Sequence, residues 1–399
     1  MVADPMAAGP PRRLAIAVFS DASGWEVMRS RPWFMPDLDR RQQVTSIFGY
    51  SSACIPAIFT GRKPNENGHW SSFFYSPETS PFKMLRHMKW LPSSVVDRGR
   101  VRSYLSKAIA AVYKYTGYFQ IYSLPFEILN LFDYAEKRDI LRPGGINEGD
   151  SIFDRLVANG TPHFVSEWRK SEEYNFDVLR SQIETEEISF AYVHTARLDA
   201  LMHDESKDSP RVDILLREHQ EQLRRTLEVA HAHYDEVRVA FFSDHGMCTV
   251  EHVVDLMPQV DALDLCYGTD YVGIYDSTML RFWFLRPGAE QKIRQALPDA
   301  AHGRWVREEE HREYGTYWSD GKFCDAVYAL EPSYLLNPSH MGNVPLKGMH
   351  GYRPDHPDSY SALLMNFDSK KPITEITDYF ELMLDMAAWA AGPRPSTDP

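Results

Sequence analysis

The chain has 399 residues, of which 43% are hydrophobic and 13% aromatic, and its formal net charge is −13. This composition supports a large buried core and disfavours nonspecific binding to nucleic acid, which requires a basic face. No segment approaches the ~20 apolar residues of a membrane span. Four cysteines without a CxxC pair favour free thiols in a reducing compartment. We therefore expect a cytoplasmic protein with no nucleic-acid polymer as partner and no membrane span; the oligomeric state is not indicated.

The first predicted element is a buried strand over residues 14–19, an apolar run that ends in a turn at Ser20-Asp21-Ala22-Ser23-Gly24. Residues 1–13, rich in Pro and Ala, are expected to be disordered. An aspartate just past a central strand is a candidate metal ligand. Asp is equally favoured as a helix N-cap, and Asp21 taken alone fits that role better.

A short helix is predicted over residues 52–59, with Ser51 or Ser52 as its N-cap and Pro56 near its first turn. A serine at a helix N-terminus lies in positive backbone potential, which favours both an alkoxide nucleophile and a bound phosphate anion. The alternative is an ordinary capping serine without a chemical role.

Two stretches differ in character from the rest of the chain. In residues 76–149, aromatic residues alternate with Lys and Arg, which predicts amphipathic helices near 107–113, 118–122 and 126–132. They would form a packed cap, a lid or an apolar pocket, and a membrane-surface role is weaker because the basic face is interrupted. Residues 256–345 contain predicted strands at 279–285 and 326–330. His302, His311 and His340 there lack a partner at metal-binding spacing and are expected to be solvated.

Between these insertions the pattern returns to alternating strands and helices, with a strand at 187–194 followed by Asp199 and His203. These two residues are spaced i, i+4, so on a helix both side chains face one side and chelate one metal. A solvated Asp–His pair on a helix surface is the alternative. A long helix over 213–235 follows.

The sequence Ser243-Asp244-His245-Gly246-Met247 follows a mostly apolar strand at 237–242. Open α/β sheets place their sites at such strand ends, and neighbouring Asp and His side chains can bind a metal through oxygen and nitrogen. His350-Gly351-Tyr352 precedes a last strand at 361–367 and a helix over 373–390, and residues 392–399 are expected to be disordered. The chain thus reads as an α/β domain over 14–391, with a central, mostly parallel sheet flanked by helices.

Together, the order of Asp21, Ser51 before Thr60-Gly61-Arg62, Asp199 with His203, the 243–247 sequence and His350 resembles the alkaline phosphatase superfamily, in its nucleotide pyrophosphatase/phosphodiesterase-like branch. The resemblance covers residues 14–75, 150–255 and 345–390 but neither insertion. It implies a metal-dependent phosphodiesterase or phosphomonoesterase that acts on a small organic phosphate or phosphonate ester through a phosphoseryl intermediate. The alternatives are a phosphoryl or phosphonate transferase or mutase on the same core, and a binding protein with a degenerate site.

The resemblance also implies a role for each motif residue. Relatives carry the nucleophile nine residues before the Thr of the Thr-Gly pair, which is Ser51. The ligands of one cation, which also binds Ser51, are then Asp21, Asp244 and His245. The ligands of the second cation are Asp199, His203 and His350. Three carboxylates and three imidazoles suit Zn²⁺, with Mn²⁺ or Fe as alternatives.

Two departures from relatives bear on the activity. Cys54 stands three residues after Ser51, where phosphodiesterase relatives usually carry an Asn that helps hold a phosphoryl oxygen. Ala53 and Ile55 occupy the offsets that sulfatases need for formylglycine formation, so sulfatase activity is not expected. Lys347 and Arg353, which flank His350, would either meet substrate charge or lie on the solvated surface.

Overall fold

The computed structural model describes residues 11–88 and 98–392, without the side chains of residues 86–88. Residues 1–10 and 393–399, most of the two termini predicted to be disordered, lie outside this description. Arg13 already belongs to the first strand.

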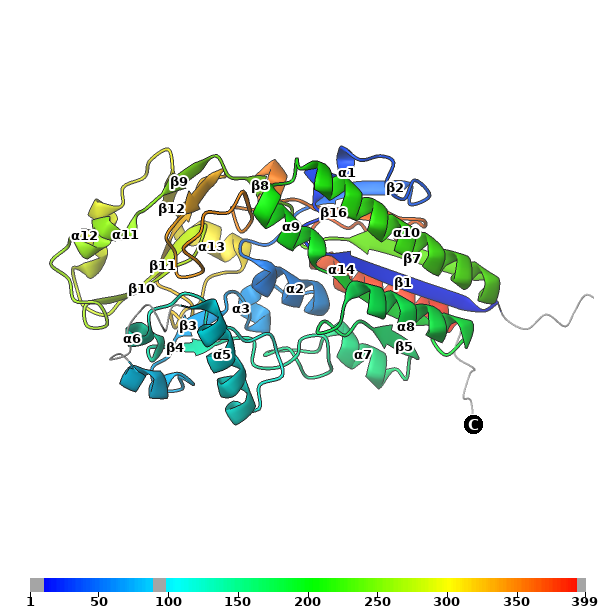
Figure 1. Cartoon of the computed structure of the whole chain (residues 1–399), viewed down its shortest axis with the longest axis horizontal. Helices are drawn as coiled ribbons and strands as arrows, with labels where there is room; N and C mark the ends of the chain where they lie inside the picture. Colours follow the sequence, from blue (N-terminus) through cyan, green and yellow to red (C-terminus); the bar gives the residue numbers. More distant parts are fainter. Residues whose placement is uncertain (1–10, 89–97, 393–399) are drawn as a thin grey trace, which may run out of the picture.

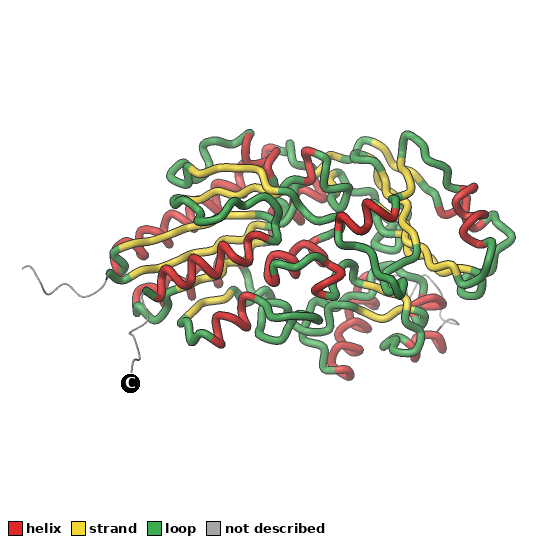
Figure 2. The backbone as a smooth tube through the Cα atoms, turned by 180° about the vertical axis from the view of Figure 1, so that it is seen from behind, coloured by secondary structure: helices red, strands yellow, loops and turns green. Residues whose placement is uncertain are grey.

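The core is a six-stranded sheet in the order β2-β16-β7-β1-β6-β5. Figure 2 shows long yellow strands of this sheet side by side at the left of the view, with red helices along them. Four neighbouring strands run parallel, and β16 pairs antiparallel with both β7 and β2. The strands are β1 (Arg13–Ser20), β2 (Arg40–Val44), β5 (His163–Val165), β6 (Phe190–Thr195), β7 (Glu236–Phe242) and β16 (Ser361–Met365). The predicted α/β class with a mostly parallel sheet is confirmed.

Helices cover both faces of this sheet, as Figure 1 shows. Successive side chains of a strand point to opposite faces, so Leu14, Ile16 and Val18 of β1 pack with α8 (Glu172–Glu184) and α10 (Pro210–His233). Phe19 faces the other way, with α2 (Ser51–Thr60) and α14 (Asp378–Ala391). Because β1 is buried on both faces, it appears in the sequence as a continuous apolar run.

The first insertion contains η1 (Lys83–Met88), α5 (Gly99–Tyr113), α6 (Phe126–Leu129) and the antiparallel pair β3 (Phe73–Tyr75) and β4 (Phe132–Tyr134). The helix predicted over 118–122 is wrong. Lys114 and Tyr122 have φ of 57° and 52°, which interrupts a right-handed helix on both sides. The aromatic residues there serve packing instead, as the rings of Phe119 and Phe82 stack at 5.6 Å.

The second insertion is built on an antiparallel sheet in the order β10-β11-β13-β12. Its strands are β10 (Tyr271–Tyr275), β11 (Met279–Phe284), β12 (Gly303–Trp305) and β13 (Ala326–Leu330), and its helices are α11 (Met257–Asp261), α12 (Ala289–Ala296) and α13 (Glu308–Tyr314). The short pairs β9 (His252–Val254) with β14 (Tyr334–Leu336) and β8 (Cys248–Thr249) with β15 (Gly348–Met349) join it to the core.

Two histidines of this insertion were expected to be solvated and are buried. His311 Nδ1 lies 2.9 Å from Thr316 Oγ1, and His340 Nδ1 accepts a hydrogen bond from the Tyr275 N–H at 3.3 Å. His340 also accepts a hydrogen bond at its carbonyl from the Ser123 N–H of the first insertion, and the His311 ring packs against Trp70. No local periodicity reveals these long-range contacts.

Shorter helices complete the chain: α1 (Trp25–Arg29), α3 (Pro64–Asn67), α7 (Ile152–Ala158) and η2 (Pro357–Ser359). At the start of α7, Ser151 and Asp154 form a reciprocal capping box. Within residues 11–88 and 98–392, no helix combines the length and apolarity needed to cross a membrane.

Candidate active site

All seven predicted site residues lie at one edge of the central sheet. Asp21 follows β1, Asp244 and His245 follow β7, and α9 (Arg197–Glu205), which follows β6, carries Asp199 and His203. Ser51 is the first residue of α2, and His350 directly follows β15. The carboxyl ends of neighbouring parallel strands meet at the same edge, which brings these distant segments together.

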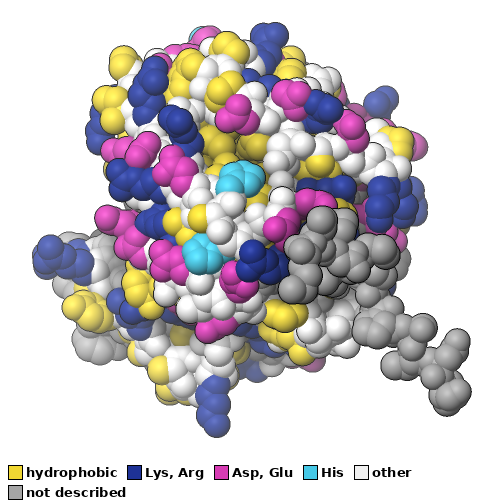
Figure 3. All heavy atoms as spheres, turned by 90° about the vertical axis from the view of Figure 1, so that its right-hand side faces the viewer, with side chains coloured by type: hydrophobic (Ala, Val, Ile, Leu, Met, Phe, Trp, Pro, Cys, Tyr) yellow, Lys and Arg dark blue, Asp and Glu magenta, His cyan; other side chains and the backbone are white. Residues whose placement is uncertain are grey.

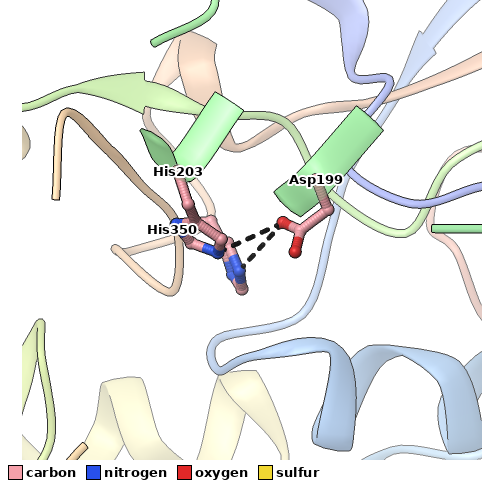
Figure 4. A group of neighbouring side chains, drawn as sticks. All are labelled: Asp199, His203 and His350. Carbon is pink, nitrogen blue, oxygen red and sulfur yellow. Dashed lines mark ion pairs between the residues drawn. The ribbon is translucent and has the colours of Figure 1, made fainter. Parts of the chain in front are cut away.

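Asp199, His203 and His350 form the first trio (Figure 4). The Asp199 Oδ1 atom lies 3.3 Å from His203 Nε2 and 3.4 Å from His350 Nε2. The one-turn spacing on α9 places the first two side chains side by side, as predicted. His203 Nδ1 donates to the Gly348 carbonyl at 2.8 Å, which leaves Nε2 as the metal-binding nitrogen.

Asp21, Asp244 and His245 form the second trio. The His245 Nε2 atom lies 3.1 Å from Asp244 Oδ2 and 3.8 Å from Asp21 Oδ1. His245 Nδ1 donates to the Gly246 carbonyl at 3.0 Å, so Nε2 again faces the carboxylates. The two trios adjoin, because the His245 and His350 rings stack with centroids 3.8 Å apart.

The chemistry of these donors fits divalent cations. Asp21 Oδ1, Asp199 Oδ1 and Asp244 Oδ2 are buried and accept no hydrogen bond from the described residues. Burial, together with repulsion from neighbouring carboxylates, raises the pKa of Asp21 and of Asp244 above the ordinary value. In each trio the candidate ligand atoms lie within 4.8 Å of one another. Bound cations would supply the positive charge that these oxygens lack.

The pKa values of the two histidines in the first trio shift in opposite directions. Burial, followed by the neighbouring His245, lowers the pKa of His350 well below its ordinary value, so this ring is neutral at pH 7. Burial also disfavours the charged form of His203, but the adjacent Asp199 carboxylate outweighs burial and raises the pKa of His203. Neutral imidazole is the form that binds metal.

Ser51 occupies the first position of α2, and its hydroxyl donates to His245 Nε2 at 3.0 Å. The prediction that Ser51 or Ser52 caps this helix is wrong. Tyr50 is the N-cap residue, without a side-chain capping bond, and Ser52 Oγ donates to the Trp70 carbonyl at 3.3 Å. Because Ser51 does not cap the helix, its hydroxyl is free for the site.

Pro56 was predicted near the first turn of α2. In the structure it lies in the second turn. Proline has no N–H, so the helix loses one backbone hydrogen bond at this point.

Cys54 packs beneath the site and does not line it. Its side chain is fully buried, and Sγ lies 3.6 Å from Ser46 Oγ and 3.7 Å from the Ile47 carbonyl oxygen. Burial raises the pKa of this thiol, which is therefore neutral. The contacts of Cys54 in this fold are thus packing contacts within the core.

Arg353 is neither solvated nor free for substrate. Its guanidinium donates two hydrogen bonds to the Glu331 carboxylate, at 2.8 and 3.1 Å, and its side chain is largely buried. Lys347 is exposed, in agreement with the alternative that it lies on the solvated surface.

One network around the site was missed by the sequence analysis. The Tyr50 hydroxyl lies 2.8 Å from Thr278 Oγ1 and accepts a hydrogen bond from the Thr278 N–H at 3.0 Å. Thr278 Oγ1 lies 3.2 Å from the carbonyl oxygen of Gly351. The neighbour of Ser51 is thereby joined, through the second insertion, to the neighbour of His350. No sequence signal links these positions, since Tyr50 and Thr278 are 228 residues apart.

Solved structures of similar shape support this fold. Murine ectonucleotide pyrophosphatase/phosphodiesterase 5, in an inactive form in complex with AMP, matches with a TM-score of 0.66 at 14% identity, over 94% of this chain and 95% of that one. The human counterpart matches with a TM-score of 0.66 at 13% identity and the same coverage. No curated protein matches the chain significantly.

The family is shown by the sequence itself. The sequence model of type I phosphodiesterase / nucleotide pyrophosphatase matches residues 41–353 and runs through both insertions, which the initial resemblance did not cover. This match spans most of the chain and, with the fold, confirms the predicted branch of the alkaline phosphatase superfamily. The chain therefore belongs to the type I phosphodiesterase / nucleotide pyrophosphatase family.

Proposed function

We propose that this phosphodiesterase-type phosphoric ester hydrolase uses Ser51 as a nucleophile and two divalent cations, most simply Zn²⁺, to cleave a small nucleotide-like ester. The observation that carries the proposal is the Ser51 hydroxyl, 3.0 Å from His245 Nε2 and near three carboxylates, each of which has one buried oxygen without a hydrogen-bond partner among the described residues. A nucleotide is the substrate class to test first, because a structurally similar protein was solved with AMP.

Two cation sites are assigned by residue. Asp21, Asp244 and His245, with Ser51, would hold one cation, and Asp199, His203 and His350 would hold the other. When bound, the cations supply positive charge that favours ionisation of the serine hydroxyl and offsets charge on the phosphoryl and leaving groups.

Ser51 and the first backbone N–H groups of α2 act directly on the phosphoryl group in the proposed reaction. Ser51 Oγ forms a bond to phosphorus while the bond from phosphorus to the ester oxygen breaks, and the serine proton ends on that oxygen as the alcohol departs. Water then attacks phosphorus, the bond to Ser51 Oγ breaks, and a water proton restores the serine hydroxyl. The product is phosphate from a monoester and a phosphate monoester from a diester. The N-terminus of α2 would stabilise negative charge at Ser51, and the Ser52 N–H, among its first backbone donors, would bind a phosphoryl oxygen.

A substrate panel tests this proposal, with Zn²⁺ or Mn²⁺ added to chelated protein. We expect nitrophenyl diesters and nitrophenyl esters of nucleoside monophosphates to be hydrolysed faster than nitrophenyl phosphate, phosphonate esters or sulfates. Preference for the monoester, or transfer of the phosphoryl group to an added alcohol instead of release, would replace the proposal by a phosphatase or a transferase. Absence of turnover with every substrate and metal would favour a binding protein.

Localisation in the cytoplasm stays a prediction. Its support is that Cys54, Cys248, Cys266 and Cys324 are all free thiols, a state that a reducing compartment preserves. Fractionation of cells that produce the chain tests it.

A further inference from the structure

The first insertion carries an unusual local charge. Between residues 98 and 126 the chain has five Lys or Arg residues and no Asp or Glu, although its formal net charge is −13. Elsewhere the two signs are interspersed, as on the face shown in Figure 3. Most of the acid-free stretch belongs to α5, which lies at the rim of the molecule, away from the central sheet (Figure 1).

One face of α5 is fixed to the protein. Arg102 and Ser106 are buried, and Arg102 Nη1 donates to the carbonyl oxygens of Tyr122 and Leu124 at 2.7 and 2.6 Å. The partly buried Leu105 packs against the core on the same side. This anchoring fixes which side of the helix faces solvent.

The solvent-facing side is both apolar and basic. Tyr104, Ala108, Ala111 and Val112 follow the i, i+4, i+7, i+8 spacing of one helix face, and Tyr104 and Val112 are 72% and 77% exposed. Beside this apolar row stands a basic row at seven-residue spacing, formed by Arg100, Lys107 and Lys114, all exposed. Among the residues that the structure describes, none of these three cations has a carboxylate partner.

We infer that the exposed face of α5 is a binding surface for an anionic lipid bilayer, on which the helix lies parallel to the membrane plane. An amphipathic helix with a basic flank and an apolar row that includes an aromatic residue is the combination that interfacial helices use. The apolar row of this face would be unfavourable against a nucleic-acid backbone, whereas it suits the acyl boundary of a bilayer. The helix does not span the bilayer.

The net negative charge of the chain does not prevent this binding. At physiological salt the Debye length is about 8 Å, so acidic residues on distant faces are screened, whereas cations at the lipid surface act directly. Each such cation strengthens binding about fivefold.

Vesicle co-sedimentation tests the inference with the full chain. We expect binding to phosphatidylcholine vesicles that contain about 30% phosphatidylserine, weak binding to pure phosphatidylcholine, and loss of binding at high salt. Lys107→Gln/Lys114→Gln should weaken binding roughly 25-fold. Tyr104→Ser/Val112→Ser should weaken it roughly tenfold, because it removes apolar contact with the acyl boundary.

The matched control is Arg224→Gln/Lys292→Gln, which removes two exposed cations that lack a carboxylate partner in the described part of the chain and lie outside α5. It should change vesicle binding by less than about twofold. Absent binding to anionic vesicles, or equal losses in control and α5 variants, would overturn the inference. So would binding to a DNA duplex that equals vesicle binding and is insensitive to Tyr104→Ser/Val112→Ser. Hydrolysis of soluble substrate by all variants should remain unchanged, which separates this inference from the proposed function.

Discussion

Two adjacent serines at the start of α2 differ in what their hydroxyls contact. Ser51 Oγ donates into the site, to His245, whereas Ser52 Oγ donates to the Trp70 carbonyl. A nucleophile requires a hydroxyl that is not committed to a structural hydrogen bond and that lies beside the charges which stabilise its alkoxide. Only Ser51 of this pair meets both conditions.

Ser51→Ala should therefore lower kcat at least roughly 1,000-fold, while metal content stays near that of the wild type. Ser52→Ala is the control and should retain most of the activity, because its hydroxyl contacts a backbone carbonyl. Turnover and bound metal can be measured on the same preparations. Full activity of Ser51→Ala would refute the nucleophile assignment.

The ligand assignment predicts a different result at Asp244, which is completely buried. Asp244→Asn removes one negative charge from the second trio, and we expect loss of bound metal together with loss of activity. His350→Ala should do the same for the other trio. Elemental analysis after gel filtration measures the effect, and wild-type metal content in both variants would contradict the ligand set.

At the scale of elements, the site depends on a turn of the second insertion. The segment between β10 and β11 reaches the start of α2 and the loop after β15 through Thr278. Gly351 has φ of 88°, and a Cβ atom there would lie 2.6 Å from Tyr50 Cε1, so the close packing of these segments requires glycine. The turn thus holds Tyr50, the residue before Ser51, close to Gly351, the residue after His350.

Thr278→Val keeps the shape of this side chain but removes its hydroxyl. We expect kcat to fall about fivefold, with KM and metal content little changed, because one hydrogen bond contributes about 1 kcal/mol. Tyr50→Phe should have a similar effect. The double variant should lose little more than either single one, since both remove the same contact.

The controls for this network are two conservative changes. Thr278→Ser restores the hydroxyl and should restore most of kcat, and the neighbouring Ser277→Ala should have little effect. If Thr278→Ser fails to restore kcat, or if the two single effects simply add, Thr278 has no positioning role.

At the scale of the whole molecule, a buried ion pair joins the two insertions. Arg281 and Asp276 are fully buried, with Nε and Oδ2 2.9 Å apart. Arg281 Nη1 also donates to the carbonyl oxygens of Phe73 and Phe323, at 3.0 and 3.1 Å. Burial raises the pKa of Asp276 although Arg281 opposes this shift. The carboxylate therefore depends on its partner to remain charged.

Arg281→Met should lower the free energy of unfolding by roughly 3–5 kcal/mol, because it leaves a buried carboxylate without its cation. Asp276→Asn/Arg281→Met should recover part of this loss. The exposed pair Arg294 and Glu290 provides the matched control, and Arg294→Met should cost less than about 1 kcal/mol. Urea unfolding measures all three, and equal losses at the buried and exposed pairs would contradict the expectation.

Acid should destabilise the protein through its buried histidines. Burial lowers the pKa of His69 and His340 to about 3 and that of His311 to about 4, whereas the unfolded chain binds these protons near pH 6.5. A proton bound only by the unfolded state favours unfolding. Each histidine therefore removes stability as pH falls from about 6.5 towards its folded pKa, by about 1.4 kcal/mol per pH unit.

His340→Asn tests this expectation through the pH dependence of the free energy of unfolding and not through its absolute value. Its free energy of unfolding should fall less steeply between pH 6 and 4 than that of the wild type, by about 1.4 kcal/mol per pH unit. The exposed His231→Asn should leave the slope unchanged. Equal slopes for wild type and His340→Asn would show that His340 is protonated in the folded protein.

The sequence by itself predicted the α/β class, four strands of the central sheet (β1, β6, β7 and β16) and the pairing of Asp199 with His203. These follow from local rules: apolar runs mark buried strands, and i, i+4 spacing places two side chains on one helix face. The full ligand trios were predicted from the resemblance to a known family and not from a local rule. Only the tertiary structure decided that Tyr50 and not Ser51 is the N-cap residue of α2, that His311 and His340 are buried, and that Thr278 reaches Tyr50. Such contacts join residues far apart in the chain, and packing selects them without leaving a periodic pattern in the sequence.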